Sequence, residues 1–385
     1  MKKIILSIVS IFISVYPLSS QKSERPSGSG TPSSPYAIST LANLRWLSEN
    51  PSIWKAGICF IQTSDIDAQE TGTWNKGAGF SPIGNSLNPF KGAYDGKGYV
   101  IYSLIIKRPV SSETGLFGYA LGATIKNLDL NDCNITGSRN VGILAGYIKS
   151  GTIDNCSGNG EITAGYGSCS SVGSLAGYAA ESQISKCHAS GTIDAFGSDS
   201  DSLRNIGGLA GYVLNCNIIS SFTSVTIKIS AGLCSDAGGF CGNITSDFGT
   251  SNISHCYSRS PIYISTFTAA NVGGFSGVLS NSIISKCYSA GILSTPPNSK
   301  NVGGFLGLND NNSSPVNSSF WDIEAASQGS IRGAGTGKNT NYMKSESTYS
   351  QAGWNFNIVW SISSSVNDGY PNLEKWYLGT AMNTY

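Results

Sequence analysis

Asn271-Val-Gly-Gly-Phe-Ser-Gly277 and Asn301-Val-Gly-Gly-Phe-Leu-Gly307 are two copies of one short phrase that recurs along this chain. Looser copies begin at Asn140, Ser171, Asn205 and Asp236. The residues at the valine position are separated by 31, 34, 31, 35 and 30 residues. A regular period in this range indicates a stacked array of repeats rather than a globular domain around one central core.

A second phrase, Ile-x-x-Cys, follows each copy after about ten residues. It begins at Ile153, Ile184, Ile218, Ile253 and Ile284, and its fourth residues are Cys156, Cys187, Ser221, Cys256 and Cys287. After the cysteine, small or apolar residues alternate with polar ones, which predicts a half-buried strand. The apolar spacing of three before the cysteine predicts a bend, and we attribute a second bend to the freedom of the phrase's glycines. Each repeat is therefore one coil of an all-β, parallel β-solenoid whose coils stack at roughly 4.8 Å.

Composition restricts the partners that the chain can have. The 385 residues include 24 Lys and Arg, 23 Asp and Glu, and 47 Gly, and only 12% are charged. A disordered chain normally carries more charge, and a compact helical protein carries less glycine. A net charge near zero argues against a nucleic-acid partner, which needs a basic face, and against a polybasic membrane tether.

The first twenty residues predict a secretory signal peptide. Lys2 and Lys3 precede an apolar stretch, Ile4–Val15, and Ser19 and Ser20 supply small residues for cleavage before Gln21. The apolar stretch is short for a membrane span, and no second one is long enough. We therefore expect a secreted or cell-surface protein with no membrane span in the mature chain.

Four of the ten cysteines fall at one equivalent position of the repeat. They predict a column of buried thiols inside the solenoid, because a free cysteine packs as a small apolar residue. Disulfide bridges between coils are the alternative in an exported chain. Cys241 aligns with other inward positions. A disulfide between Cys216 and Cys234 is an alternative that the sequence does not decide.

The remaining sequence predicts the domain organisation. Residues 21–35 are rich in Ser, Pro and Gly and predict a linker, and residues 36–325 form the solenoid. Within Tyr36–Leu47, leucines recur every three residues, which indicates a short helix that covers the open first coil. Residues 326–385 contain a helical stretch and five large aromatic residues, which predict a compact cap closing the other end: Trp354, Phe356, Trp360, Tyr370 and Trp376.

The phrase Val-Gly-Gly-Phe-x-Gly, with its variant Thr114-Gly-Leu-Phe-Gly118, resembles the GLUG repeat of bacterial surface proteins. The framing sequences, Pro35–Leu41 before the repeats and Asn367-Asp-Gly-Tyr-Pro371 after them, are similar to those of such proteins from Bacteroidetes-like bacteria. The resemblance implies a secreted or surface solenoid of adhesin-like type, and it supplies no catalytic residues. GLUG repeats also occur in some IgA-cleaving metallopeptidases, where the peptidase is a separate domain.

The motifs of several enzyme classes are missing from the sequence. The two histidines, His188 and His255, are followed by Ala189 and Cys256, so the His-Glu-x-x-His motif of zinc peptidases is absent. Neither Cys-x-x-Cys spacing nor a Gly-x-Ser-x-Gly elbow occurs. The stretch Gly333–Lys338 departs from a phosphate-binding loop at both ends, so we interpret it as a turn and expect no cofactor and no metal.

Two columns of residues are candidates for binding. The position after the cysteine is occupied by Ser157, His188, Phe222, Tyr257 and Tyr288. The position after the last glycine of the phrase is occupied by Tyr119, Tyr147, Tyr178, Tyr212, Asn243, Val278 and Leu308. Exposed stacked aromatic residues suit sugar rings or a protein partner. The alternative is that the stacked side chains only stabilise the coils. This alternative is favoured more strongly for the second column, because its last residues are aliphatic.

Three functions stay open from the sequence. The first is a non-catalytic adhesin-like protein that binds a glycan or a protein through the first column: His188, Phe222, Tyr257 and Tyr288. The second is a polysaccharide lyase or hydrolase, which needs two carboxylates facing one cleft; Asp199 and Asp201, in the longest insertion between repeats, are the candidates. The third is a matrix component without a ligand. The column from Asn140 to Asn301 predicts side-chain hydrogen bonds that join one coil to the next.

Overall fold

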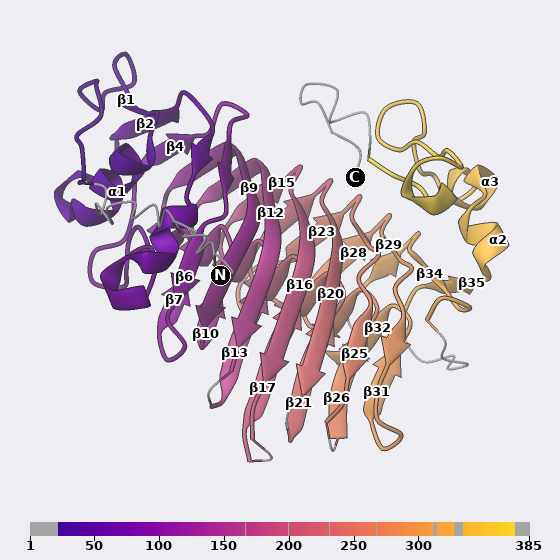
Figure 1. Ribbon diagram of the computed structural model, residues 1–385. Coiled ribbons are helices and arrows are strands. Elements are labelled where there is room, and N and C mark those ends of the chain that lie inside the picture. Colours follow the sequence, from indigo (N-terminus) through magenta and orange to yellow (C-terminus); the bar gives the residue numbers. More distant parts are fainter. Residues whose placement is uncertain are drawn as a thin grey trace, which may run out of the picture.

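The computed structural model describes residues 22–165, 167–198, 200–230, 232–266, 268–310, 314–326 and 334–373. As predicted, these residues form an all-β parallel solenoid (Figure 1). Successive coils lie side by side along one axis, so that each strand pairs in parallel with the equivalent strand of the next coil. The predicted signal peptide, residues 1–20, lies outside the described residues.

Two sheets of seven strands make two sides of the solenoid. Sheet 1 contains β7 (Ser112–Thr114), β10 (Arg139–Val141), β13 (Cys169–Gly173), β17 (Ser202–Gly207), β21 (Leu233–Gly238), β26 (Thr268–Gly273) and β31 (Lys300–Gly303). Sheet 2 contains β8 (Phe117–Leu121), β11 (Ala145–Lys149), β14 (Ala176–Ala180), β18 (Ala210–Leu214), β22 (Cys241–Thr245), β27 (Ser276–Leu279) and β32 (Leu306–Asn309).

The largest sheet, sheet 3, closes the remaining sides. Its regular strands are β9 (Thr124–Gly137), β12 (Thr152–Ala164), β15 (Gln183–Ser185), β16 (His188–Phe196), β19 (Asn217–Ile219), β20 (Phe222–Ser230), β23 (Ser251–Ser254), β24 (Tyr257–Ser258), β25 (Ile262–Ile264), β28 (Ser282–Ser285), β29 (Tyr288–Ser289), β30 (Leu293–Ser294), β33 (Val316–Asn317), β34 (Phe320–Asp322) and β35 (Thr336–Lys338). At the N-terminal end it adds β1 (Tyr36–Ile38), β2 (Cys59–Gln62), β3 (Ile66–Asp67), β4 (Ala93–Asp95), β5 (Val100–Tyr102) and β6 (Ile105–Lys107).

The corners of each coil are single residues with left-handed backbone angles. The residue before the cysteine position has a positive φ in every regular coil, which confirms the predicted bend: Asn155, Lys186, Ser220, His255 and Lys286. The first residue of the glycine phrase also has a positive φ: Asn140, Ser171, Asn205, Asp236, Asn271 and Asn301. Asparagine tolerates this region better than most residues, which explains its frequency there.

The glycines of the phrase have a different role from the one that we expected. They do not supply the left-handed angle, because the residue before the valine position does so. A Cβ atom at Gly277 would lie less than 3.0 Å from the backbone of Asp236 and Ala237 in the preceding coil. Glycine is therefore required because sheets 1 and 2 meet at a corner where adjacent coils leave no room for a side chain.

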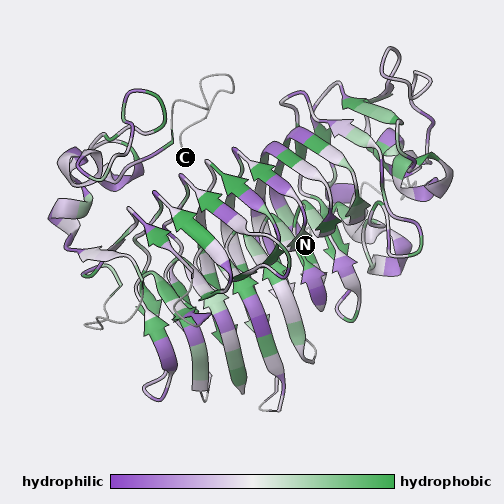
Figure 2. Ribbon diagram, turned by 180° about the vertical axis from the view of Figure 1, so that it is seen from behind, coloured by the Kyte–Doolittle hydropathy of each residue, from purple (hydrophilic) through white to green (hydrophobic). Residues whose placement is uncertain are grey.

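The interior is filled by columns of equivalent side chains. The isoleucines of the second phrase and the valine-position residues are fully buried through most of the array. In the last coils the position after Gly-Gly becomes a ladder of rings, in which Phe240, Phe275 and Phe305 stack with centroids 4.7 and 4.9 Å apart. Figure 2 shows apolar segments recurring on successive strands along the solenoid.

The predicted thiol column is present. Cys156, Cys187, Cys256 and Cys287 are buried, and the backbone N–H of Cys256 donates to Sγ of Cys287 at 3.4 Å. All ten cysteines belong to the described part of the chain and are free thiols, so the structure contains no Cys216–Cys234 bridge. Burial raises the pKa of the Cys187 thiol to about 12 and that of Cys216 to about 11.

A helical segment covers the first coil. Helix α1 (Leu41–Glu49) begins at Thr40, whose side chain accepts a hydrogen bond from the Asn43 N–H, and its three leucines are buried. Residues 22–35, predicted as a linker, instead pack onto this end of the solenoid. The Cys59 N–H donates to the Gly30 carbonyl at 2.7 Å, because the edge of the first coil needs backbone partners.

The C-terminal segment does not simply close the open end, as the sequence had suggested. Helices α2 (Thr340–Met343) and α3 (Glu346–Ser350) belong to a cap that packs against the outer face of sheet 3 near β29 and β34 (Figure 1). The cap and the ladder beneath it form a second hydrophobic cluster, separate from the interior. Phe320 joins this outer cluster, whereas its neighbour Trp321 joins the interior core.

Hydrogen bonds fix the cap on the solenoid. The Tyr288 hydroxyl donates to the Pro371 carbonyl at 2.6 Å and accepts from the Asn367 amide at 2.8 Å. The Arg259 guanidinium donates to the Asn367 carbonyl at 2.7 Å and to the Asp368 carboxylate at 2.8 Å. These bonds join residues about 80 to 110 positions apart in sequence, so the cap docks on coils that were completed long before it in the chain.

We expect Asn271→Ala to lower the free energy of unfolding by about 1–3 kcal/mol, because the variant loses two hydrogen bonds and keeps a left-handed backbone. The Asn271 amide donates to Asp236 at 2.7 Å and accepts from Asn301 at 2.8 Å. Asn271→Gly should lose only the hydrogen-bond part, about 1 kcal/mol. Chemical denaturation measures both, and an unchanged midpoint in both variants would contradict the ladder.

We expect the native protein at pH 8 to expose at most one reactive thiol, that of the half-buried Cys59. The other nine thiols are buried, and reaction with a disulfide reagent needs an accessible thiolate. Titration with an aromatic disulfide checks this before and after unfolding in denaturant. Ten thiols should react after unfolding, and a smaller number would reveal bridges.

We expect Tyr288→Ala to lower the free energy of unfolding by about 3–5 kcal/mol, as a buried aromatic residue does when truncated. Tyr288→Phe keeps the stacked ring and should cost about 1–2 kcal/mol for the lost hydroxyl contacts. Tyr263→Ala is the matched control, because Tyr263 is 41% exposed on the same sheet. Thermal unfolding and limited proteolysis of residues 340–373 measure the effect, and equal midpoints for Tyr288→Ala and Tyr263→Ala would contradict a docked cap.

Candidate functional site

The first predicted column is a continuous ladder on the outer face of sheet 3, which we call the outer ladder. Strand register places Ser157, His188, Phe222, Tyr257, Tyr288 and Phe320 in successive coils. Neighbouring rings from His188 to Tyr288 are stacked, with centroids 4.8–5.1 Å apart and interplanar angles of 4–9°. The predicted stacking is therefore confirmed.

The expected exposure of this ladder is wrong at its C-terminal end. Tyr257 is 5% exposed and Tyr288 is 0% exposed, because the cap covers them. Trp360 lies against both rings at centroid distances of 6.2 Å, and Trp354 contacts Tyr288. These two tyrosines hold the cap and offer no surface to a partner, whereas His188 and Phe222 are half-buried.

At its other end the outer ladder places Asp129, Ser157 and His188 on three consecutive coils. The arrangement does not match a nucleophile activated by histidine, because the Ser157 hydroxyl donates directly to Asp129 at 2.7 Å. Burial lowers the pKa of His188, although the Asp129 charge opposes the shift. The Ser157–Asp129 hydrogen bond therefore continues the coil-to-coil side-chain contacts of the outer ladder.

The second column is the more accessible one. Tyr119, Tyr147, Tyr178 and Tyr212 lie in register on β8, β11, β14 and β18 of sheet 2, and all four are half-buried. Their centroids are 4.6, 4.7 and 4.8 Å apart, with interplanar angles of 13°, 15° and 26°. We call this row the tyrosine ladder. Its period comes from the repeat, but its accessibility depends on the absence of the cap from this side.

Stacking determines what the tyrosine ladder presents. Each inner ring covers the faces of its neighbours, so the exposed parts are ring edges and phenol hydroxyls rather than aromatic faces. The ladder ends at Asn243, which pairs with Tyr212, and the following coils carry Val278 and Leu308. The exposed row is therefore roughly 14 Å long, as the three spacings imply.

The surroundings of the tyrosine ladder are mostly acidic. Burial raises the pKa of Tyr147 to about 12, and the charges of Glu181 and Glu113 contribute. Burial likewise raises the pKa of Tyr212, and Asp247 and Asp236 add to the shift. Lys149 is paired with Glu181 at 3.3 Å. The phenols therefore stay protonated at neutral pH and can both donate and accept hydrogen bonds.

The carboxylates proposed for an enzyme are not assembled in the structure. Asp199 lies outside the described residues. Asp201 accepts hydrogen bonds from the Ser198 N–H at 2.7 Å and the Ser198 hydroxyl at 2.8 Å, which lower its pKa and fix it in its own loop. Within the described ranges, no group of three or more His, Cys, Asp or Glu side chains is arranged to hold a metal ion.

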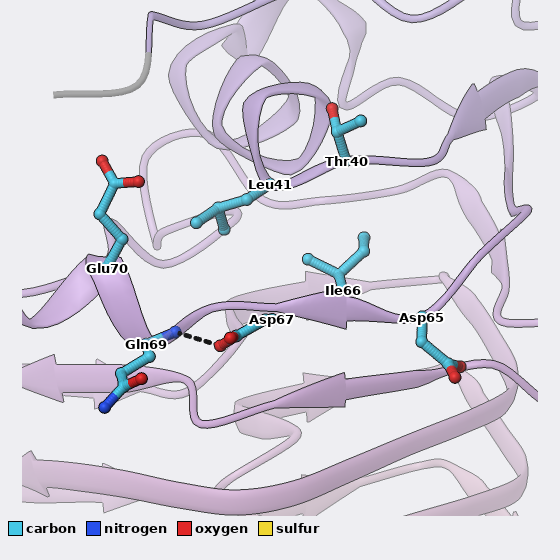
Figure 3. A pocket seen from close by; sticks show the side chains of 7 residues that line it. All are labelled: Thr40, Leu41, Asp65, Ile66, Asp67, Gln69 and Glu70. Carbon is cyan, nitrogen blue, oxygen red and sulfur yellow. Dashed lines mark hydrogen bonds between the residues drawn. The ribbon is translucent and has the colours of Figure 1, made fainter. Parts of the chain in front are cut away.

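A hollow of about 560 Å³ lies beside the first coil (Figure 3). Its wall combines Leu41 and Ile66 with three exposed carboxylates, Asp65, Asp67 and Glu70. The carboxylates point in different directions in Figure 3, and each accepts a hydrogen bond from a nearby N–H group. Asp67 and Glu70 therefore stabilise local turns, Asp65 bonds to strand β5, and the three carboxylates do not converge on one point.

Comparisons with known proteins agree with this architecture. Residues 168–194 match the family model described as the GLUG motif. The chain is 36% identical over 142 residues to halomucin from Haloquadratum walsbyi, covering 35% of this chain and 2% of halomucin. It is 29% identical over 416 residues to a "Putative Gly-rich membrane protein" from Evansella cellulosilytica, covering 91% of this chain and 46% of that relative. The chain thus spans less than half the length of either relative.

A solved structure has the same fold. It is described as "a putative immunoglobulin A1 protease from Bacteroides ovatus" and superposes with a TM-score of 0.58 at 19% identity. The match covers 90% of this chain and 94% of that one, so it extends over nearly the whole architecture. In the residues that the structure describes here, no helix is long and apolar enough to cross a membrane. The chain is a repeat protein that carries the GLUG motif on a parallel β-solenoid.

Proposed function

We propose that this chain is a secreted or cell-surface repeat protein that binds a glycan or a protein through a face of its solenoid, without catalysis. The GLUG motif and the similarity to halomucin and to a Gly-rich membrane protein support a location outside the cytoplasm. The signal-like sequence of residues 1–20 supports export in the same way.

The tyrosine ladder is the observation that carries the binding proposal. It places four half-buried phenols on one regular sheet, with fixed spacing and with hydroxyl groups able to donate or accept. Tyrosine is favoured at binding surfaces because one rigid side chain supplies both apolar area and a hydrogen bond. Stacking already orders the rings, so binding there costs little additional conformational entropy of the tyrosine side chains.

Non-catalytic binding is favoured over hydrolysis or elimination by the position of the acidic side chains. Cleavage of a glycosidic bond by two carboxylates needs them on opposite sides of one bond, about 5–10 Å apart. Glu113 and Glu181 instead flank the tyrosine ladder in different coils, and Glu181 is occupied by Lys149 and by the Ser150 hydroxyl at 2.8 Å. Asp201 is held by Ser198 in its own loop.

We expect Tyr147→Ala and Tyr178→Ala each to weaken binding about tenfold or more, because each removes a phenol hydroxyl and a ring edge from the middle of the row. The measurement is retention of the purified chain on immobilised host and microbial polysaccharides and surface proteins, with release of new sugar ends recorded in parallel.

Tyr263→Ala, on a different face, is the matched control and should bind as the parent does. Equal binding by all three variants would exclude the tyrosine ladder as the site. Release of sugar ends would replace the binding proposal with an enzyme.

A further inference from the structure

One coil carries an inserted loop beside the tyrosine ladder. Between β22 and β23 the corner is lengthened by residues 246–250, and this insertion contributes to the 35-residue spacing at that point. Ser246 accepts a hydrogen bond from the Ser251 N–H at 2.6 Å, and Gly249 has a φ of 98°, which closes the turn. The loop therefore has a defined conformation, which its own hydrogen bond and turn maintain.

The loop is tied to the coils on both sides. The Asp247 N–H donates to the Asn215 side chain in the preceding coil at 3.1 Å, and the Asn281 amide in the following coil donates to the Ser246 carbonyl at 3.2 Å. The loop directly follows β22, whose Asn243 is in register with Tyr212, and Asn215 directly follows β18, so the loop lies at that end of the tyrosine ladder.

Phe248 at the tip of this loop is 89% exposed. The side chain at the tip of this anchored loop is therefore accessible to a ligand. It also supplies what the tyrosine ladder lacks, because the ladder rings cover one another and leave only edges. Phe248 offers an uncovered aromatic face, the surface on which the apolar face of a sugar ring packs.

Charge selects the kind of glycan. Glu113, Asp236 and Asp247 lie near the tyrosine ladder, and the Lys149–Glu181 ion pair adds no net charge. A chain of uronic acids or sulfated sugars would meet a net negative charge at this face, and bringing like charges together disfavours binding. A neutral sugar chain can instead donate its hydroxyls to these carboxylates.

A protein partner fits this face less well. The centre of a protein interface is depleted of charged residues, which collect at its rim. Here charged side chains follow the tyrosine ladder coil by coil, and Lys149 and Glu181 lie next to its inner rings. A thin, hydroxyl-rich chain that lies along the ladder contacts the phenols without burying those charges.

We propose that the tyrosine ladder and Phe248 together form a binding site for a neutral polysaccharide, with phenol hydroxyls and carboxylates contacting sugar hydroxyls and Phe248 stacking on one sugar ring. The inference rests on the proposed function and specifies its ligand class.

The test is affinity electrophoresis and calorimetry of the full chain with neutral glucan, mannan and galactan, and with polygalacturonate as the acidic probe. At least one neutral polymer should bind, and polygalacturonate should not. Phe248→Ala should weaken binding to that polymer about tenfold, whereas Phe248→Trp should retain it. Because Phe248 is 89% exposed, neither variant should change the unfolding midpoint.

The outcomes separate the two proposals. Loss of binding in Tyr147→Ala but not in Phe248→Ala would overturn the role of Phe248 and leave the ladder as the site. Preference for polygalacturonate, or capture of a protein but no glycan through the ladder, would overturn the neutral-glycan inference alone. Binding that is unaffected by the ladder variants would overturn both proposals.

Discussion

The whole structure depends on one constraint, the close and constant spacing between successive coils. Parallel strands must stay in hydrogen-bonding contact at every side of the solenoid, so each residue lies directly above its equivalent in the next coil. At the corner between sheets 1 and 2 this contact leaves no volume for a side chain, and positions such as Gly277 must be glycine. The glycines of the repeat phrase therefore recur because the same steric restriction recurs in every coil.

The same spacing turns every recurring side chain into a ladder. Inside, it aligns isoleucines, buried thiols and the rings of Phe240, Phe275 and Phe305. At the corners it joins Asp236, Asn271 and Asn301 by amide hydrogen bonds, and a second corner does the same with Asp95, Asn127 and Asn155. Outside, it produces two aromatic rows that are alike in spacing and differ in what covers them.

The two rows illustrate how a shared geometry acquires different roles. In the outer ladder, Tyr257 and Tyr288 serve as the docking surface for the chain's own C-terminal cap, which brings Trp354, Trp360 and Tyr370 onto the stacked rings. In the tyrosine ladder, stacking covers ring faces and leaves hydroxyls and edges accessible. The insertion at residues 246–250 then adds the uncovered ring of Phe248 beside that second row.

The sequence by itself determined the solenoid, because period, inward columns and the bend before each cysteine are local features repeated in every coil. It also determined the thiol column, since four cysteines share one position. Only the tertiary structure decided which outer row is accessible, why the phrase needs glycine, and where the cap lies. The cap reaches Tyr288 and Arg259 through contacts such as Arg259–Asp368, which are far apart in sequence and occur once. A periodic pattern carries no information about where a non-repeating segment packs, so accessibility emerged only when the whole chain was folded.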